Sequence, residues 1–348
     1  MALLAAACAK DETIDTDEPA PDPAVFEAAG PNAVSHLSFT LDSSGRSLPV
    51  TIWYPAESQG PGSVYEYLIE DGQEEAYRSL LDAAPAGCPV EQTVAGDLPP
   101  LAGEWPLVLF SHCHECVRFS MATVAERMAS HGFLVAAPDH TGNTLWNKLD
   151  GDGEPLGEAF LQTRAADIAA LLAELQVDSH VADVTPGPLG MMGHSFGAVT
   201  TGLVMGQQPE FEAGLAMAAP MENPLIPGAE IDDIDEPILF LLAEEDNSIT
   251  ELGNVLIRTN HEEAKDSWIV EVPDAGHWSF SDIAGLHADF MPGCGSDTRQ
   301  TNPAETFDYL DPAAGRDVAA ETATAFFSAT LLDDPSGLAW LDQRASRE

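Results

Sequence analysis

The chain has 348 residues, 45% of them hydrophobic and 7% aromatic, which is the composition of a globular protein with a large buried core. It carries 58 acidic and 13 basic residues, giving a formal net charge of −45 at pH 7. Such a surface repels phosphate backbones and excludes nucleic-acid binding, and no run approaches the roughly 18 apolar residues that a membrane helix requires. The acidity is typical of a solubility or high-salt adaptation, and we expect a monomer.

The first residues suggest export. Residues 1–8, MALLAAAC, are small and apolar up to Cys8, and the next residues are acidic and proline-bearing without apolar periodicity. This order is similar to the lipobox of a bacterial lipoprotein followed by a tether. We predict a signal remnant over residues 1–8 with lipidation of Cys8, and a disordered acidic tether over residues 9–32. The protein is then exported, either anchored at the bacterial cell envelope or extracellular; the alternative is an accidental likeness, since the apolar run is short and lacks preceding basic residues.

Strand and helix signals alternate from residue 34 onward. Repeated βα units of this length predict a mostly parallel sheet with helices on both faces. Apolar runs and period-two alternation predict strands over residues 36–41, 48–54, 106–110, 133–137, 189–192, 213–218, 237–243 and 268–272. Apolar spacing of three and four predicts helices over residues 73–81, 117–128, 161–175, 198–205 and 318–332.

One serine lies at the sharp turn between a buried strand and an apolar helix. The sequence Gly193-His194-Ser195-Phe196-Gly197 is a G-x-S-x-G nucleophile elbow in the setting that this motif requires. The serine adopts a strained backbone conformation, and side chains two residues to either side would collide with the strand and helix, hence the glycines. The alternative is a structural loop serine. The motif predicts that Ser195 is a nucleophile and that the fold is that of an α/β-hydrolase.

A serine nucleophile needs a base and an acid, and in this fold they follow it in the order acid, histidine. His277 follows the strand over residues 268–272 and is the predicted base. The strand over residues 237–243 runs into three consecutive carboxylates. Asp246 is the predicted acid because it is far enough along to have left the strand, with Glu244 and Glu245 as alternatives.

Three sequence blocks carry a family resemblance. FSHCHECVRFS, ERMASHGFLVAAPDHTGNT and GHSFG are similar to platelet-activating-factor acetylhydrolases and dienelactone-hydrolase-like esterases, over roughly residues 48–332. The resemblance implies an α/β-hydrolase catalytic domain, here residues 33–348, with oxyanion donors at the backbone N–H groups of His114 and Phe196. The chain departs from the pattern at Cys113, where the family has glycine, and its acid placement is closer to that of cutinase-type polyester hydrolases and dienelactone hydrolases than to that of the acetylhydrolases.

The cysteines other than Cys8 form an even set of four. We predict a disulfide from Cys113 to Cys116 that stiffens the oxyanion loop, and a second from Cys88 to Cys294. The alternative for the His-Cys-His-x-Cys cluster is a metal site, which lacks the second ligand pair that structural zinc usually needs. The acidic run over residues 150–154 resembles part of a calcium-binding loop, but the downstream glutamate of that motif is missing. We therefore expect a flexible acidic turn here rather than a calcium site.

These residues predict a serine carboxylic-ester hydrolase that acts through an acyl-enzyme on a short-to-medium acyl ester and needs no cofactor or metal. Small-molecule or polymeric esters are the expected substrates. The alternatives are polyester or dienelactone hydrolysis and, in another class, a non-catalytic surface lipoprotein on a hydrolase scaffold.

Residues 146–159 and 221–236 are expected to overhang the site. Trp146, Trp278 and Phe280 are the predicted walls of an apolar pocket, with ordinary packing as the alternative.

Overall fold

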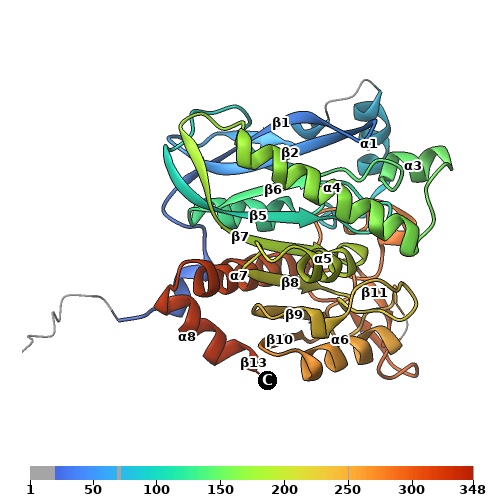
Figure 1. Ribbon diagram of the computed structural model, residues 1–348. Helices are drawn as coiled ribbons and strands as arrows, with labels where there is room; N and C mark the ends of the chain where they lie inside the picture. Colours follow the sequence, from blue (N-terminus) through green and yellow to red (C-terminus); the bar gives the residue numbers. More distant parts are fainter. Residues whose placement is uncertain (1–19, 69–71, 250, 348) are drawn as a thin grey trace, which may run out of the picture.

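A nine-stranded sheet forms the centre of the computed structural model, which describes residues 20–68, 72–249 and 251–347. The strand order is β1-β2-β6-β5-β7-β8-β9-β10-β13 (Figure 1). The strands from β6 to β10 pair in parallel, whereas β1, β2 and β13 pair antiparallel. The bounds are β1 Ala33–Ser43, β2 Arg46–Ala56, β5 Gly103–Ser111, β6 Leu134–Pro138, β7 Val184–His194, β8 Ala213–Met217, β9 Ile238–Ala243, β10 Ser267–Val272 and β13 Ser346–Arg347.

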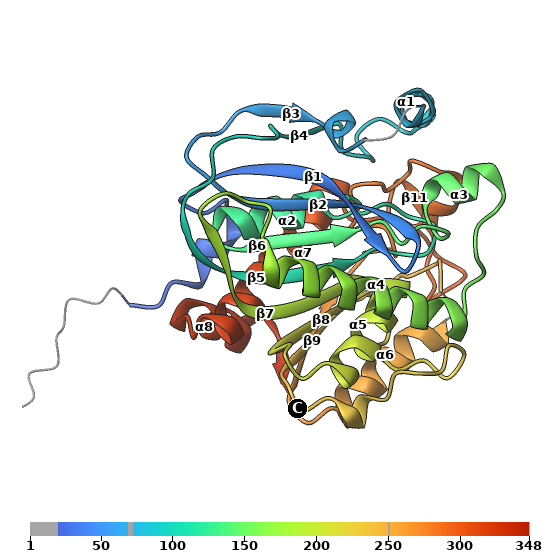
Figure 2. The same cartoon turned by 45° about the horizontal axis from the view of Figure 1, so that its top comes forward.

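Helices cover both faces of this sheet (Figures 1 and 2). One face carries α4 (Glu158–Val177), α5 (Phe196–Gln207) and α6 (Glu251–Glu263), and the other carries α2 (Ala122–Ser130) and α7 (Pro312–Leu331), with α8 (Pro335–Arg344) packed on α7. Alternate side chains of β5 enter opposite cores, Leu107 and Leu109 on the α4 side, Val108 and Phe110 on the α7 side. This is the period-two burial of a central strand with two covered faces.

Smaller elements lie outside the main layers. Figure 2 shows β3, β4 and α1 lying above β1. The bounds are β3 Pro61–Ser63, β4 Gln92–Val94, β11 Ser296–Thr298, β12 Thr306–Asp308, α1 Gln73–Ala83 and α3 Leu145–Asp150, with 3-10 turns η1 Pro23–Glu27, η2 Val64–Tyr67, η3 Ile231–Asp233 and η4 Ala288–Phe290.

The predicted α/β-hydrolase architecture is confirmed, with one helix boundary corrected. The helix expected over residues 117–128 begins only at Ala122. Val117 and Met121 are fully buried as their apolar spacing suggested, but residues 117–121 form turns that enter the helix. Over so short a stretch, a buried turn and the buried face of a helix give the same spacing of apolar residues in the sequence, so the spacing alone could not locate the start of the helix. The pattern also missed α3, α6 and α8.

The expected tether is wrong for the part that the structure describes. Residues 1–19, including Cys8 and the predicted signal remnant, lie outside the described residues. Within the segment 9–32, Pro23–Glu27 forms η1, and Phe26 is 1% exposed in the core cluster. The Arg127 guanidinium donates to the Phe26 carbonyl at 2.9 Å. One aromatic side chain therefore holds this acidic stretch against the domain.

Across residues 20–68, 72–249 and 251–347, no helix combines the length and apolarity needed to cross a membrane.

Candidate active site

The nucleophile elbow joins β7 to α5. Ser195 has φ 56° and ψ −119°, and its N–H donates to the Met217 carbonyl of β8 at 2.9 Å. A Cβ on Gly193 would run into the carbonyl of Gly197, and a Cβ on Gly197 would run into that of Ser111. The two glycines thus permit a close approach of strand, turn and helix that holds a strained, partly exposed serine.

The three side chains predicted for catalysis form one hydrogen-bonded chain. His277 Nε2 lies 2.8 Å from Ser195 Oγ, and His277 Nδ1 lies 2.6 Å from Asp246 Oδ2. Ser195 follows β7, Asp246 follows β9 and His277 follows β10, so all three come from the carboxyl ends of parallel strands. His277 is 2% and Asp246 0% exposed, so the imidazole and its carboxylate are shielded from water. A hydroxyl whose proton has an acceptor at this distance can act as a nucleophile.

The neighbouring Glu245 carboxylate points elsewhere. Asp246 Oδ1 accepts the N–H groups of Ser248 and Ile249, both at 3.0 Å, which leaves Oδ2 for the histidine. Glu245 instead pairs with Arg299 at 3.1 Å and accepts from Thr301. Glu245 therefore secures the loop after β9, and the geometry favours Asp246 over it as the partner of the imidazole.

His194, the variable residue before the serine, supports the histidine loop. Its Nε2 donates to the His277 carbonyl at 2.8 Å, and the two rings lie 5.0 Å apart. Burial lowers the pKa of His194 to about 3, so this ring is neutral at ordinary pH. A neutral donor fixes the backbone of His277 without placing a second positive charge beside it.

The predicted oxyanion loop is closed by a disulfide. Both predicted bonds, Cys113 to Cys116 and Cys88 to Cys294, are confirmed. The first encloses His114 and Glu115, and Glu115 has φ 56°, a left-handed conformation that is uncommon for a non-glycine residue.

The two predicted oxyanion donors come from different segments, His114 from the disulfide-closed loop and Phe196 from the start of α5. Phe196 is the first residue of α5, directly after Ser195. The His114 side chain is oriented by Asn143, whose amide nitrogen lies 2.7 Å from its Nδ1. Burial lowers the pKa of His114, which favours the neutral ring that accepts this bond.

The metal alternative loses its thiolate ligands because both cysteines of the cluster are in a disulfide. Within the part of the chain that the structure describes, no group of three or more histidine, cysteine or acidic side chains is arranged to hold a metal ion. In the acidic run after α3, Gly151 takes a left-handed conformation, and Asp152 accepts from the Asn147 amide at 3.0 Å.

The predicted pocket walls do not behave alike. Phe280 belongs to the core cluster and is 0% exposed, so it has no surface free to line a pocket and the packing alternative holds for it. Trp278 packs edge-on against His277 at 5.2 Å and is nearly buried, whereas Trp146 on α3 is partly exposed.

Of the two overhanging segments, α3 lies at the carboxyl edge of the sheet (Figure 1). Lys148 of α3 is ion-paired with Glu115 and with Asp289, both at 2.6 Å. The segment over residues 221–236 instead buries most of its apolar side chains against α5 and α6, although Leu225 stays exposed.

Arg164 and Asn143 were missed by the sequence reasoning. Arg164 lies on the buried face of α4, three residues after Leu161 and four before Ile168, and is 0% exposed. A charged residue inside an apolar helical stripe was the available signal.

Comparisons with known proteins show which family the chain belongs to. The family model described as dienelactone hydrolase family matches residues 97–285, more than half of the chain. The chain belongs to the dienelactone hydrolase family. A second family model, platelet-activating factor acetylhydrolase, isoform II, matches residues 28–146 of this family member.

Individual relatives of this dienelactone hydrolase family member are more distant. Platelet-activating factor acetylhydrolase from Bos taurus is 26% identical over 182 residues, 40% of each chain, so the match spans about two fifths of that relative's length. The Cavia porcellus enzyme of the same name is 22% identical over 291 residues, 72% of this chain and 64% of its own. A solved structure, ferulic acid esterase from Streptomyces cinnamoneus, aligns with a TM-score of 0.65 at 21% identity, covering 90% of this chain and 94% of its own.

Proposed function

We propose that this protein is a serine carboxylic-ester hydrolase in which Ser195 attacks the ester carbonyl, His277 takes up and returns the proton, and Asp246 orients His277. The observation that carries this proposal is the continuous contact from Ser195 Oγ through the imidazole to Asp246, at 2.8 and 2.6 Å. Attack gives a tetrahedral oxyanion, loss of the alcohol gives the acyl-enzyme, and water activated by the same histidine releases the acid. The His114 and Phe196 N–H groups are the proposed oxyanion donors.

The substrate class follows from charge and from the relatives. Platelet-activating factor acetylhydrolases are named for removing an acetyl group, which supports a short acyl chain. Glu115 adjoins the proposed donor His114, and with Asp289 it outweighs the charge of Lys148 between them. A rim with this balance, on a protein of net charge −45, favours neutral esters over anionic ones such as a dienelactone carboxylate.

The proposal extends to location. Two disulfides are characteristic of oxidising compartments outside the cytoplasm. We therefore propose an exported enzyme, with lipidation of Cys8 as the means of attachment to the cell envelope.

A p-nitrophenyl ester series from acetate to palmitate, assayed on the wild type and on Ser195→Ala, tests the activity. We expect turnover to be highest for short acyl chains and to vanish in the variant. Equal turnover by both proteins, or none at any chain length, contradicts the proposal. Stoichiometric labelling of Ser195 by a fluorophosphonate distinguishes an enzyme with an untested substrate from a non-catalytic lipoprotein.

A further inference from the structure

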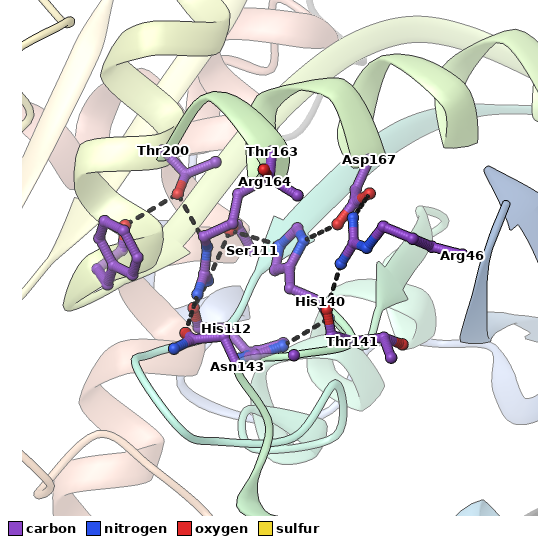
Figure 3. Close-up of polar contacts among 12 residues, drawn as sticks. Arg46, Ser111, His112, His140, Thr141, Asn143, Thr163, Arg164, Asp167 and Thr200 are labelled. Atoms are coloured by element: carbon purple, nitrogen blue, oxygen red, sulfur yellow. Dashed lines mark hydrogen bonds and ion pairs between the residues drawn. The ribbon is translucent and has the colours of Figure 1, made fainter. Parts of the chain in front are cut away.

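A buried arginine lies behind the predicted oxyanion hole. Figure 3 shows Arg164 of α4 at the centre of a polar network between β5, α4 and α5. Its side chain is 0% exposed, and among the described residues no carboxylate lies within ion-pair distance of it. The nearby Asp167 carboxylate is already bound by Arg46 and by His140. Burial lowers the pKa of Arg164 to about 9, so it remains charged at neutral pH despite the cost of desolvation.

The guanidinium donates to the segment that carries the first predicted oxyanion donor. One nitrogen donates to Ser111 Oγ at 3.1 Å and to the carbonyl of His112 (Figure 3). A second donates to the Asn143 amide oxygen at 2.9 Å, and the Asn143 amide nitrogen in turn holds the side chain of His114. The arginine thus fixes the entry to the disulfide-closed loop and, through one intermediary, His114 itself.

The same guanidinium holds the segment that carries the second predicted donor. Its Nε donates to Thr200 Oγ1 at 3.1 Å, and the Thr200 hydroxyl donates to the Phe196 carbonyl at 2.9 Å. Its central carbon lies 4.6 Å from the centre of the Phe196 ring, a cation–π contact. One planar cation therefore touches both segments that must keep a fixed spacing around the oxyanion.

This network also contains a second serine–histidine–aspartate chain. His140 lies 3.0 Å from both Ser111 Oγ and Asp167 Oδ2. Ser111 is 0% exposed and its hydroxyl oxygen already accepts from Arg164, so no ester can reach it. Burial keeps the pKa of His140 well below its usual value, and this chain serves to hold Ser111 in place.

We propose that Arg164 is a positioning residue for the oxyanion hole, which fixes the spacing of the His114 and Phe196 donors and adds a buried positive charge behind them. This inference rests on the proposed ester hydrolysis. In a water-excluded region a fixed cation favours the developing oxyanion over the neutral ester, so its effect falls on the transition state. A buried charge without a direct counter-ion costs stability, and stabilising the oxyanion gives a reason for retaining it.

The test compares three variants of the full-length chain with the wild type. Arg164→Met removes the charge and the planar donors, Arg164→Lys keeps the charge alone, and Leu172→Ala on the same helix is a control for lost stability. The measurements are kcat and KM for p-nitrophenyl acetate, the inhibition constant of an aryl trifluoromethyl ketone, and the melting temperature. The ketone reacts with a serine nucleophile to give a tetrahedral adduct with an oxyanion, so its affinity reports on the hole.

We expect Arg164→Met to lose about 100-fold in kcat and a similar factor in ketone affinity, with KM within about threefold of the wild type. Arg164→Lys should recover part of both losses. Leu172→Ala should lower the melting temperature but leave both constants near wild type. If Arg164→Met matches Leu172→Ala in kcat and ketone affinity, the inference is overturned.

A variant that does not fold is replaced by Thr200→Val, which cuts the link from the guanidinium to the Phe196 carbonyl. We expect a roughly tenfold loss in both kcat and ketone affinity, and unchanged values for both overturn the inference. An inactive wild type removes the proposed function and this inference together, whereas an active wild type with an unaffected Arg164→Met removes this inference alone.

Discussion

Replacement of Asp246 by asparagine tests the proposed triad at its most sensitive point. Asp246 Oδ1 accepts two backbone N–H groups, from Ser248 and Ile249, so the oxygen of an asparagine must take that position. The amide nitrogen then faces His277 Nδ1, which lies 2.6 Å from Oδ2 in the wild type. The imidazole must present a bare Nδ1 to this donor and carry its proton on Nε2, where it cannot accept the proton of Ser195.

The expected loss is large because the variant stabilises the wrong tautomer while keeping the shape of the site. We expect kcat for p-nitrophenyl acetate to fall by about 10⁴-fold, equivalent to ~5 kcal/mol in the transition state, with little change in KM. Steady-state kinetics between pH 6 and 9, with circular dichroism to confirm folding, measures this loss.

Glu245→Gln is the matched control. It removes a charge one residue away, but Glu245 pairs with Arg299 and Thr301 rather than with the imidazole. We expect it to keep kcat within about tenfold of the wild type, at a cost of about 1 kcal/mol in the free energy of unfolding. Comparable losses in kcat for the two variants would show that the carboxylate assignment is wrong.

Three further predictions follow from the described contacts. Burial raises the pKa of Glu126 to about 8, above its unfolded value of 4.5, so its contribution to stability is complete below pH 4.5 and is lost as the pH rises through 8. The free energy of unfolding of Glu126→Gln should therefore exceed that of the wild type by ~1–3 kcal/mol at pH 9 and equal it at pH 5. The same difference between variant and wild type at both pH values would refute this. The Cys88–Cys294 bond spans 206 residues and the Cys113–Cys116 bond spans 3, so replacing both cysteines by serine should lower the free energy of unfolding by about 4–5 kcal/mol for the long-range bond and by about 2 for the short-range bond. In contrast, kcat should fall more when the Cys113–Cys116 bond is removed, because that bond closes the oxyanion loop. The reverse order in kcat would contradict the role given to this loop. A fluorophosphonate should modify the peptide containing Ser195 and leave Ser111 unlabelled, because Ser111 is 0% exposed. Peptide mapping that finds the label on Ser111 would contradict the structural role of the chain formed by Ser111, His140 and Asp167.

The local pattern of the sequence determined the fold and two members of the proposed triad. Alternating strand and helix signals sufficed for the sheet, because apolar periodicity records which face of each element is buried. The elbow located Ser195 because its glycines and its strand–turn–helix setting are all contiguous in the chain. His277 could be predicted because it directly follows a strand.

Only the tertiary structure decided which carboxylate faces the imidazole and what holds the oxyanion loop. Glu245 and Asp246 are adjacent and chemically alike. What distinguishes them is Arg299, 54 residues further along the chain, which forms an ion pair with Glu245 and not with Asp246. The hydrogen-bond partners of Arg164 come from β5 and the loop after it, from α5 and from the loop after β6, none of which is local to it in the chain. Burial, hydrogen-bond partners and counter-ions depend on contacts between distant segments, and no local spacing of residue types records them.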